Sequence, residues 1–228
     1  MRPMRAAGAP FALAVALIAD APALAQSAPA PSGAAGNLAN AELTARVDGA
    51  IANATSYRVQ VAAPGGVSID IREWRPDRVK ITTTSGVGTA ERIIVGTAMY
   101  YREPGAAWKS APIPPVAHVR RNRLFMGAPD SLLQPLPDRS EGAATYGAFR
   151  SEALGNQQRP GTMDCTYDKE TYRPRACTVT LQGSTTPIQV SYSGWDDAAN
   201  LVEPPPGVPE PPPASAAPAP SPSPRGTR

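Results

Sequence analysis

Residues that commonly carry catalysis or bind metals are scarce in this sequence. Its 228 residues include one histidine, His118, and two cysteines. Catalytic triads and metal sites need several such groups close together, and no GxSxG, HExxH, Walker or dinucleotide-binding glycine motif is present. The adjacent carboxylates Asp196 and Asp197 would point to opposite faces of a strand, so we expect them in a turn after Trp195. The sequence therefore predicts a non-enzymatic protein that uses no metal and no cofactor.

Long hydrophobic runs are also missing, apart from a short one near the N-terminus. Residues 1–25 combine Arg2 and Arg5, an apolar run over 11–19 and a small-residue Ala-Leu-Ala sequence before Gln26. This order is typical of a cleaved secretory signal peptide. The run is shorter than the ~20 residues that a membrane-spanning helix needs, and prolines around it disfavour an uncleaved anchor. No cysteine follows directly after the cleavage point, so we expect an exported chain that is not lipidated.

The two cysteines, Cys165 and Cys177, form an even pair in a chain expected to reach an oxidising compartment. Structural disulfides form in such compartments, whereas a redox-active pair usually has CxxC spacing. Both cysteines are equally far from Thr171, so a hairpin with its turn over 169–172 would place them opposite each other. We predict a disulfide that stabilises the fold by about 3 kcal/mol in the chain-entropy model.

Apolar periodicity predicts one helix after a disordered lead-in. Residues 26–39 are rich in Ala, Pro, Ser and Gly, a composition that favours disorder. A helix is expected over 40–54 with Asn40 as its N-cap. Its apolar face repeats every four residues and consists of Leu43, Val47 and Ile51. Such a face must pack against another element.

From Tyr57 the apolar period changes from four residues to two. Short alternating segments between Gly, Pro and Ser turns are typical of an antiparallel sheet with one covered face. Strands are expected near 57–61, 67–71, 79–83, 91–95, 98–102, 146–153, 162–167, 176–181 and 188–192. The preceding helix is the natural cover for the apolar side, which predicts an α+β domain.

Prolines interrupt the strand pattern over 112–142. We expect one or two short helical pieces there, in a mobile crossover that exposes apolar side chains such as Leu132 and Leu133. A basic cluster in the same region would face acidic lipid head groups or simply form a solvated surface. It consists of Arg120, Arg121 and Arg123.

From Glu203 the composition changes to Pro, Ala and Ser. Such a segment cannot form a core and favours an extended, polyproline-II-like chain. We therefore expect the folded domain to cover 40–207 and a disordered tail to cover 208–228. The tail would serve as a spacer or as a docking segment for a partner.

Four segments contain turn and strand residues in a distinctive order. Residues 74–81 contain a Pro-Asp-Arg turn before a basic and apolar alternation, and 93–101 read Ile-Ile-Val-Gly-Thr-Ala-Met-Tyr-Tyr. Residues 105–109 end in Trp-Lys, and 192–195 (Tyr-Ser-Gly-Trp) lead to a Pro-rich stop. This order resembles the outer-membrane lipoprotein carrier superfamily, whose members share the LolA/LolB-like fold. The resemblance covers about residues 40–207.

The resemblance implies a curved antiparallel half-barrel sheet, covered by an N-terminal helix and short crossover helices. Members of this superfamily bind acyl chains or other hydrophobic ligands between sheet and helices. The arginine that holds the lid in the soluble lipoprotein carrier has three candidates here, Arg58, Arg72 and Arg78.

These features predict a periplasmic carrier or binder of lipid or of another hydrophobic ligand. Alternation alone does not distinguish a ligand cavity from a closed core, because both have the same inward face. The expected cavity and lid residues are Val59, Val61, Ile69, Ile71, Val79, Ile81, Tyr100, Leu132 and Leu133.

The expected partners are a lipid or a lipidated protein and a membrane-associated protein. A formal net charge of +3 gives no reason to expect nucleic acid. The alternative function is an envelope sensor or interaction module of the same fold, which regulates a partner protein.

Overall fold

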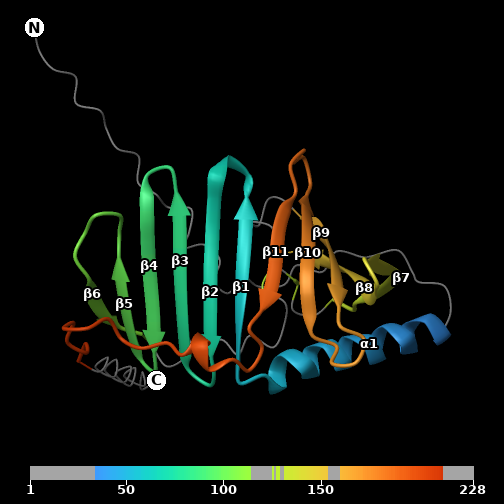
Figure 1. The fold of residues 1–228 in the computed structure, drawn as a ribbon, viewed down its shortest axis with the longest axis horizontal. Coiled ribbons are helices and arrows are strands. Elements are labelled where there is room, and N and C mark those ends of the chain that lie inside the picture. The colour runs from blue at the N-terminus through green and yellow to red at the C-terminus, as the bar shows by residue number, and fades with distance from the viewer. Residues whose placement is uncertain (1–33, 114–124, 126, 129–130, 154–159, 213–228) are drawn as a thin grey trace, which may run out of the picture.

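An antiparallel sheet of eleven strands organises the residues that this computed structural model describes, which are 34–113, 125, 127–128, 131–153 and 160–212 (Figure 1). The strands follow one another across the sheet in the order β6-β5-β4-β3-β2-β1-β11-β10-β9-β8-β7. Their bounds are β1 Ser56–Ala63, β2 Val67–Trp74, β3 Arg78–Ser85, β4 Gly88–Val95, β5 Ala98–Arg102, β6 Lys109–Pro112, β7 Gln134–Glu141, β8 Ala144–Ala153, β9 Gly161–Tyr167, β10 Pro174–Leu181 and β11 Ile188–Ser193. The helical elements are α1 Ala34–Asn53 and the 3₁₀ turns Pro64–Gly66 and Ala198–Asn200.

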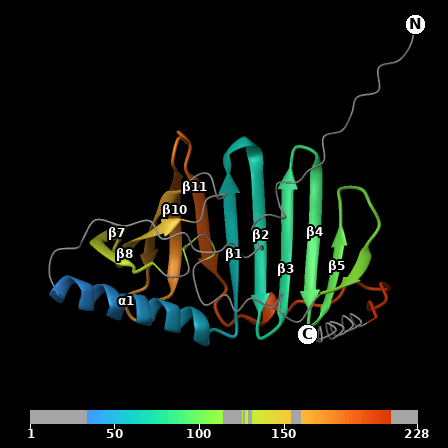
Figure 2. The same cartoon turned by 180° about the vertical axis from the view of Figure 1, so that it is seen from behind.

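The sheet is open and curved. β6 and β7 are its two edges, and β7 and β8 turn out of the plane in which β1 to β5 lie side by side (Figures 1 and 2). α1 runs along the side toward which β7 and β8 turn, which we call the concave face, and the other side is the convex face (Figure 2). The predicted fold class, an α+β half-barrel with an N-terminal helix, is confirmed. Within the described residues, no helix has the length and apolar character needed to cross a membrane.

The helix begins earlier than predicted. α1 starts at Ala34, inside the segment expected to be disordered, and Asn40 is therefore an interior residue and not an N-cap. Three alanines over 34–39 favour helix more strongly than the Ser, Pro and Gly nearby oppose it. The predicted apolar face is confirmed, since Leu43, Val47 and Ile51 are buried.

The structure has a strand, β7, where the sequence predicted a helical crossover. Part of 112–142 is a strand that pairs with β8, from Gln134 opposite Arg150 to Glu141 opposite Ala144. An edge strand tolerates proline because one of its sides needs no ladder hydrogen bonds. The register shifts between Leu136 and Arg139, around the second proline of the strand. Residues 114–124, with the rest of the expected helical pieces, lie outside the described residues.

The main core lies between α1 and the concave face. The buried side chains of α1 meet a layer from β8 to β11 that includes Phe149, Met163 and Val179, each at 0 % exposure. Cys165 and Cys177 lie opposite each other on β9 and β10 and form the predicted disulfide, with an S–S distance of 2.05 Å. The disulfide is part of this core, because both cysteines are buried.

A second, smaller core lies on the convex face over β4 and β5. The buried Ile93, Ala98 and Tyr100 are covered by the C-terminal segment, which crosses this face in front of the strands (Figure 1). Val202 in that segment is 2 % exposed, and Val208 packs against the same cluster. The packed chain therefore extends past residue 207, while residues 213–228 of the expected tail lie outside the described residues.

A proline-glycine turn shapes the C-terminal segment. The Val208 amide donates to the Pro205 carbonyl at 3.4 Å, and Gly207 has φ +74°. Pro at the second position and a positive φ at the third are the features of a type II turn, which glycine adopts without strain. The turn places both Val202 and Val208 on the second core.

Candidate ligand-binding face

Six of the predicted cavity residues share the concave face of the sheet. Val59 lies opposite Ile71, which in turn lies opposite Ile81, and Val61 lies opposite Ile69. Val79 is two residues before Ile81 on β3, so it points the same way. The register thus joins Val59, Val61, Ile69, Ile71, Val79 and Ile81 into one apolar surface.

The burial of this surface decreases from β1 toward β4. Val59, Val61 and Ile71 are at most 4 % exposed, beside the core under α1. Farther from α1, the apolar side chains of the same face are only half-buried. We call this group the open strip; it consists of Ile69, Val79, Ile81, Ile94 and Met99.

Tyr100 does not lie in this surface. The hairpin between β4 and β5 places Tyr100 opposite Ile93, which itself lies opposite Lys80 on the convex face. Because neighbouring residues of a strand point to opposite faces, Tyr101 is the tyrosine on the concave face. The prediction chose the wrong member of an adjacent pair, since alternation gives no sign of which tyrosine faces inward.

The two predicted lid leucines also point apart. Leu133 is 2 % exposed within the main core, and its amide donates to Thr44 Oγ1 on α1 at 2.9 Å. Leu132 is 47 % exposed. Adjacent residues in an extended segment face opposite ways, so only Leu133 contacts the interior.

Polar groups occupy one end of the concave face. The Tyr57 hydroxyl donates to Glu73 Oε2 at 2.7 Å, and Arg75 Nε lies 3.3 Å from Glu73 Oε1. Burial, reinforced by the Glu73 carboxylate, raises the pKa of Tyr57 above its ordinary value. Burial also raises the pKa of Tyr192, whose hydroxyl accepts a hydrogen bond from the Phe125 amide at 3.1 Å. These two phenols therefore stay protonated and serve as hydrogen-bonding groups inside the fold.

The three arginines considered for a lid contact all lie on the convex face. Arg58 makes two hydrogen bonds to Asp70, at 2.6 and 3.0 Å, and Arg72 lies 3.8 Å from the same carboxylate. Arg78 donates to the Val202 carbonyl at 3.1 Å. The concave face instead carries Arg92, which lies opposite Ile81 and Tyr101. The sequence did not predict that Arg92 faces inward, because the apolar residues 93–95 that follow it show no alternation.

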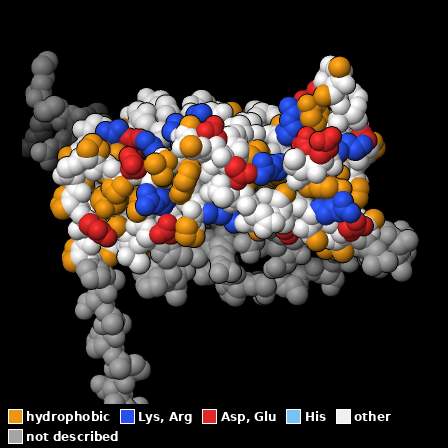
Figure 3. Space-filling view, turned by 60° about the horizontal axis from the view of Figure 1, so that its bottom comes forward, with side chains coloured by type: hydrophobic (Ala, Val, Ile, Leu, Met, Phe, Trp, Pro, Cys, Tyr) orange, Lys and Arg blue, Asp and Glu red, His pale blue; other side chains and the backbone are white. Residues whose placement is uncertain are grey.

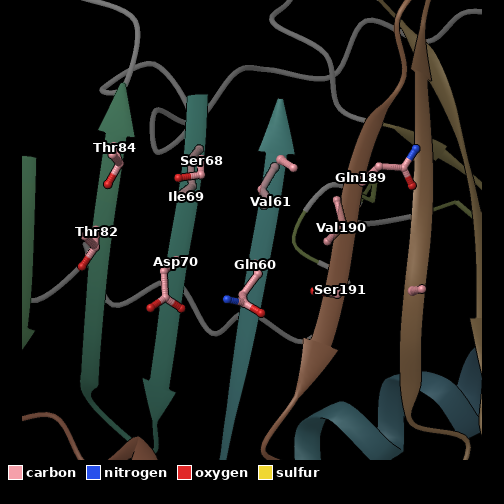
Figure 4. A pocket seen from close by; sticks show the side chains of 12 residues that line it. Gln60, Val61, Ser68, Ile69, Asp70, Thr82, Thr84, Gln189, Val190 and Ser191 are labelled. Atoms are coloured by element: carbon pink, nitrogen blue, oxygen red, sulfur yellow. The ribbon is translucent and has the colours of Figure 1, made fainter. Parts of the chain in front are cut away.

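A depression of about 420 Å³ lies over the central strands and is lined mainly by polar side chains of the convex face (Figure 4). The labelled Gln60, Asp70 and Thr82 come from three neighbouring strands. Polar and charged side chains of both signs also intermix with apolar ones in Figure 3. The depression is open and has Gln60 and Asp70 among its lining residues, so it offers an acyl chain no continuous apolar wall.

The adjacent carboxylates Asp196 and Asp197 both accept hydrogen bonds from the backbone. Asp196 lies in the turn predicted after Trp195 and accepts from the Thr55 amide at 2.7 Å, while Arg173 pairs with its other oxygen. The Thr55 amide, together with Arg173, lowers the pKa of Asp196. Within the described ranges, no three His, Cys, Asp or Glu side chains are grouped as a metal site. His118 and the basic cluster Arg120, Arg121 and Arg123 lie outside those ranges.

No protein-family model and no curated protein matches the chain. Solved structures do match. The lipoprotein LppX from Mycobacterium tuberculosis is 15 % identical with a TM-score of 0.46, over 72 % of this chain and 97 % of that one. LprF from Mycobacterium bovis is 10 % identical with a TM-score of 0.47, over 70 % and 93 %.

The fold of this chain is an open, curved antiparallel sheet with an N-terminal helix on its concave face. A LolA superfamily protein from Nitrosomonas europaea also matches, at 10 % identity and a TM-score of 0.30, over 68 % of this chain and 91 % of that one. At these identities the likeness is one of fold alone, and the function is argued from the residues of this chain.

Proposed function

We propose that this protein is a non-enzymatic periplasmic carrier or binder of a lipid or another hydrophobic ligand, whose acyl chains lie on the concave face. The observation that carries this proposal is the open strip. Ile69, Val79 and Ile81 pack against the main core yet are only half-buried, although they continue the same apolar face as the buried Val59 and Ile71.

An acyl chain laid along the open strip would remove apolar surface from water on both partners. Each Å² of apolar surface so buried contributes about 25 cal/mol. The strip adjoins a core that α1 and the disulfide hold in place, so its walls are formed before ligand arrives. Preformed walls reduce the ordering cost of binding.

The periplasmic setting rests on two features of the chain. The N-terminal sequence is typical of a cleaved export signal. The Cys165–Cys177 disulfide fits an oxidising compartment, because a reducing compartment keeps thiols in the reduced form. Both features support export, and native mass spectrometry of protein from its own envelope would identify a lipid that co-purifies.

Replacing Ile69 by aspartate tests the binding face directly. Ile69 is half-buried, so a charge there stays partly solvated and the fold should survive, while an acyl chain would have to desolvate it. We expect Ile69→Asp to weaken binding of a fluorescent fatty acyl probe by at least about tenfold. The matched control is Ser68→Asp, an exposed neighbour on the convex face, which should bind like the unmodified protein.

The result that would overturn the proposal is failure of the delipidated, folded protein to bind the probe at any concentration tested. That result would favour the sensor or interaction module. Equal binding by Ile69→Asp and Ser68→Asp would also count against it, because the site would then lie elsewhere.

A further inference from the structure

One cross-strand row of the concave face changes from apolar to cationic along its length. The row contains one residue from each of six neighbouring strands, from Val59 on β1 to Lys109 on the edge strand β6. Its members, in order, are Val59, Ile71, Ile81, Arg92, Tyr101 and Lys109. Directly opposed residues have Cβ atoms about 4.5–5.5 Å apart, so neighbours in this row lie close enough together to contact one ligand.

Arg92 differs from the other arginines of the described chain. It forms neither a hydrogen bond nor an ion pair with any described residue, and its Nε is shielded from solvent. Every other described arginine has a carboxylate, carbonyl or hydroxyl partner; these are Arg46, Arg58, Arg72, Arg75, Arg78, Arg102, Arg139, Arg150, Arg173 and Arg175.

An arginine without a partner on an apolar face lowers stability, because a partly desolvated charge has lost water without gaining a counter-charge. The neighbours of Arg92 in the row cannot supply that charge. Ile81 is apolar, Tyr101 offers a hydroxyl, and Lys109 adds a second cation. Within strands β1 to β6, the carboxylate on this face is Glu73, which Tyr57 and Arg75 engage at the end of β2. The missing group is therefore an anion that comes from outside the described chain.

We propose that Arg92, with Tyr101 and Lys109 beside it, binds the anionic head group of an acyl-chain lipid whose chain lies over Ile81 and the neighbouring residues of the open strip. The inference rests on the proposed function and adds the charge and the direction of the ligand. A guanidinium binds carboxylate or phosphate oxygens through two parallel N–H groups, and the Tyr101 hydroxyl can donate a further hydrogen bond. Arg92, Tyr101 and Lys109 are named the head-group triad.

The dimensions of the row suit such a ligand. Neighbouring strands are about 4.8 Å apart, so the two steps from β4 to β2 span about 10 Å. An acyl chain that starts at Arg92 would cross Ile81 and the half-buried Ile69, and it would end where the face is closed at Ile71 and Val59, each 1 % exposed. The head group would then remain toward the β6 edge, where Lys109 is exposed.

The test compares anionic and neutral ligands of equal chain length. A fatty acid is paired with its fatty alcohol, and a lysophosphatidic acid with its monoacylglycerol, each in competition with a fluorescent acyl probe. We expect the unmodified protein to prefer at least one anion by about tenfold or more, the size of one charge-assisted hydrogen bond. The pair with the larger preference identifies carboxylate or phosphate as the head group.

Substitutions at Arg92 should remove that preference and nothing else. Arg92→Met keeps most of the stem volume but not the charge, so anion and neutral ligand should bind equally. Arg92→Lys should retain part of the preference. The control is Arg72→Met on the convex face of β2, which should keep the full preference. Without ligand, Arg92→Met should be at least as heat-stable as the unmodified protein, whereas loss of a structural arginine would lower the Tm.

Three results separate this inference from the proposed function. If the unmodified protein binds anionic and neutral ligands equally and Arg92→Met changes nothing, the head-group triad is wrong while the carrier function stands. A drop in Tm with an unchanged preference would likewise assign Arg92 a structural role. If no acyl ligand of either charge binds, the proposed function itself fails.

Discussion

The two halves of the sheet share one strand pattern but differ in how their apolar side chains are covered. In the helix-covered half, formed by β1 and β8 to β11, the concave side chains lie under α1 and around a disulfide. In the open half, formed by β2 to β6, those of the open strip are only half-buried, and the cover lies instead on the convex face. The comparison shows that alternation determines which face is apolar, while the elements outside the sheet determine whether that face is closed.

This difference gives the two halves different roles. A well-packed core gives stability and a fixed shape, whereas a surface that binds ligand must stay accessible. Here the helix-covered half provides the well-packed core, and the open half provides the accessible surface. The convex second core, held by the C-terminal segment, anchors β4 and β5 without occupying the concave side.

The largest expected contrast is between two large-to-small substitutions, one in each half. Phe149 on β8 is 0 % exposed and its ring centroid is 5.8 Å from that of Tyr167. Phe149→Ala should lower the free energy of unfolding by about 3–5 kcal/mol, because it leaves a cavity in a closed core. Ile81→Ala, at the half-buried open strip, should lower it by only about 1 kcal/mol. Urea unfolding of both variants measures the difference.

Similar losses in the two variants would contradict the comparison. They would mean that the open strip is packed as tightly as the main core, which would leave no room for an acyl chain. The Ile81→Ala variant should also bind acyl probes more weakly, so its two measurements can be compared in one protein.

Much of this fold could be predicted from periodicity and turn residues. The nine expected strands, the apolar face of the helix and the Cys165–Cys177 pairing all follow from local patterns, and the structure confirms them. β7 was missed because its prolines oppose strand formation unless the strand lies at an edge, and edge position depends on the whole sheet. The choice between Tyr100 and Tyr101, and the inward position of Arg92, likewise depend on register across several strands.

The C-terminal segment was the hardest part to predict. Its Pro-rich composition indicates that it cannot fold by itself, and this is consistent with what the structure shows for 201–212, which have no helix or strand. Composition does not reveal, however, that Val202 packs against an apolar cluster on the convex face and that Pro205 is buried. A segment without a core of its own can still complete the core of another.

An intermediate effect is expected from shortening the C-terminus. Ending the chain after Leu201 exposes the second core and removes the buried Val202, but it also releases the entropy of an ordered segment. The free energy of unfolding should fall by about 1–2 kcal/mol. Ending the chain after Gly207 keeps Val202 and Pro205 and loses only the half-buried Val208, so the Tm should barely change. Equal Tm values for the two truncations would show that the segment adds nothing to the convex core.

The smallest expected effect concerns the convex ion pairs, in which the two halves should behave alike. In the helix-covered half, hydrogen bonds from Arg150, at 2.6 and 2.8 Å, hold the pKa of Asp164 below its ordinary value. In the open half, burial opposes ionisation of Glu91, but Lys80 and Arg102 outweigh it and also lower its pKa. The equivalence of these two sites provides a matched pair of variants, Asp164→Asn and Glu91→Gln.

A carboxylate whose pKa is lowered by folding stabilises the protein above the pKa of the unfolded chain, near 4. That contribution is lost as the pH falls through the lower value of the folded state. Each variant should therefore lose about 0.2–1 kcal/mol at pH 7, and the difference from the unmodified protein should vanish toward pH 2. Thermal unfolding between pH 2 and 7 measures both curves. If the stability differences of both variants follow the same pH dependence, the two halves differ only on the concave face. If only one variant shows a pH dependence, the halves also differ in their convex ion pairs.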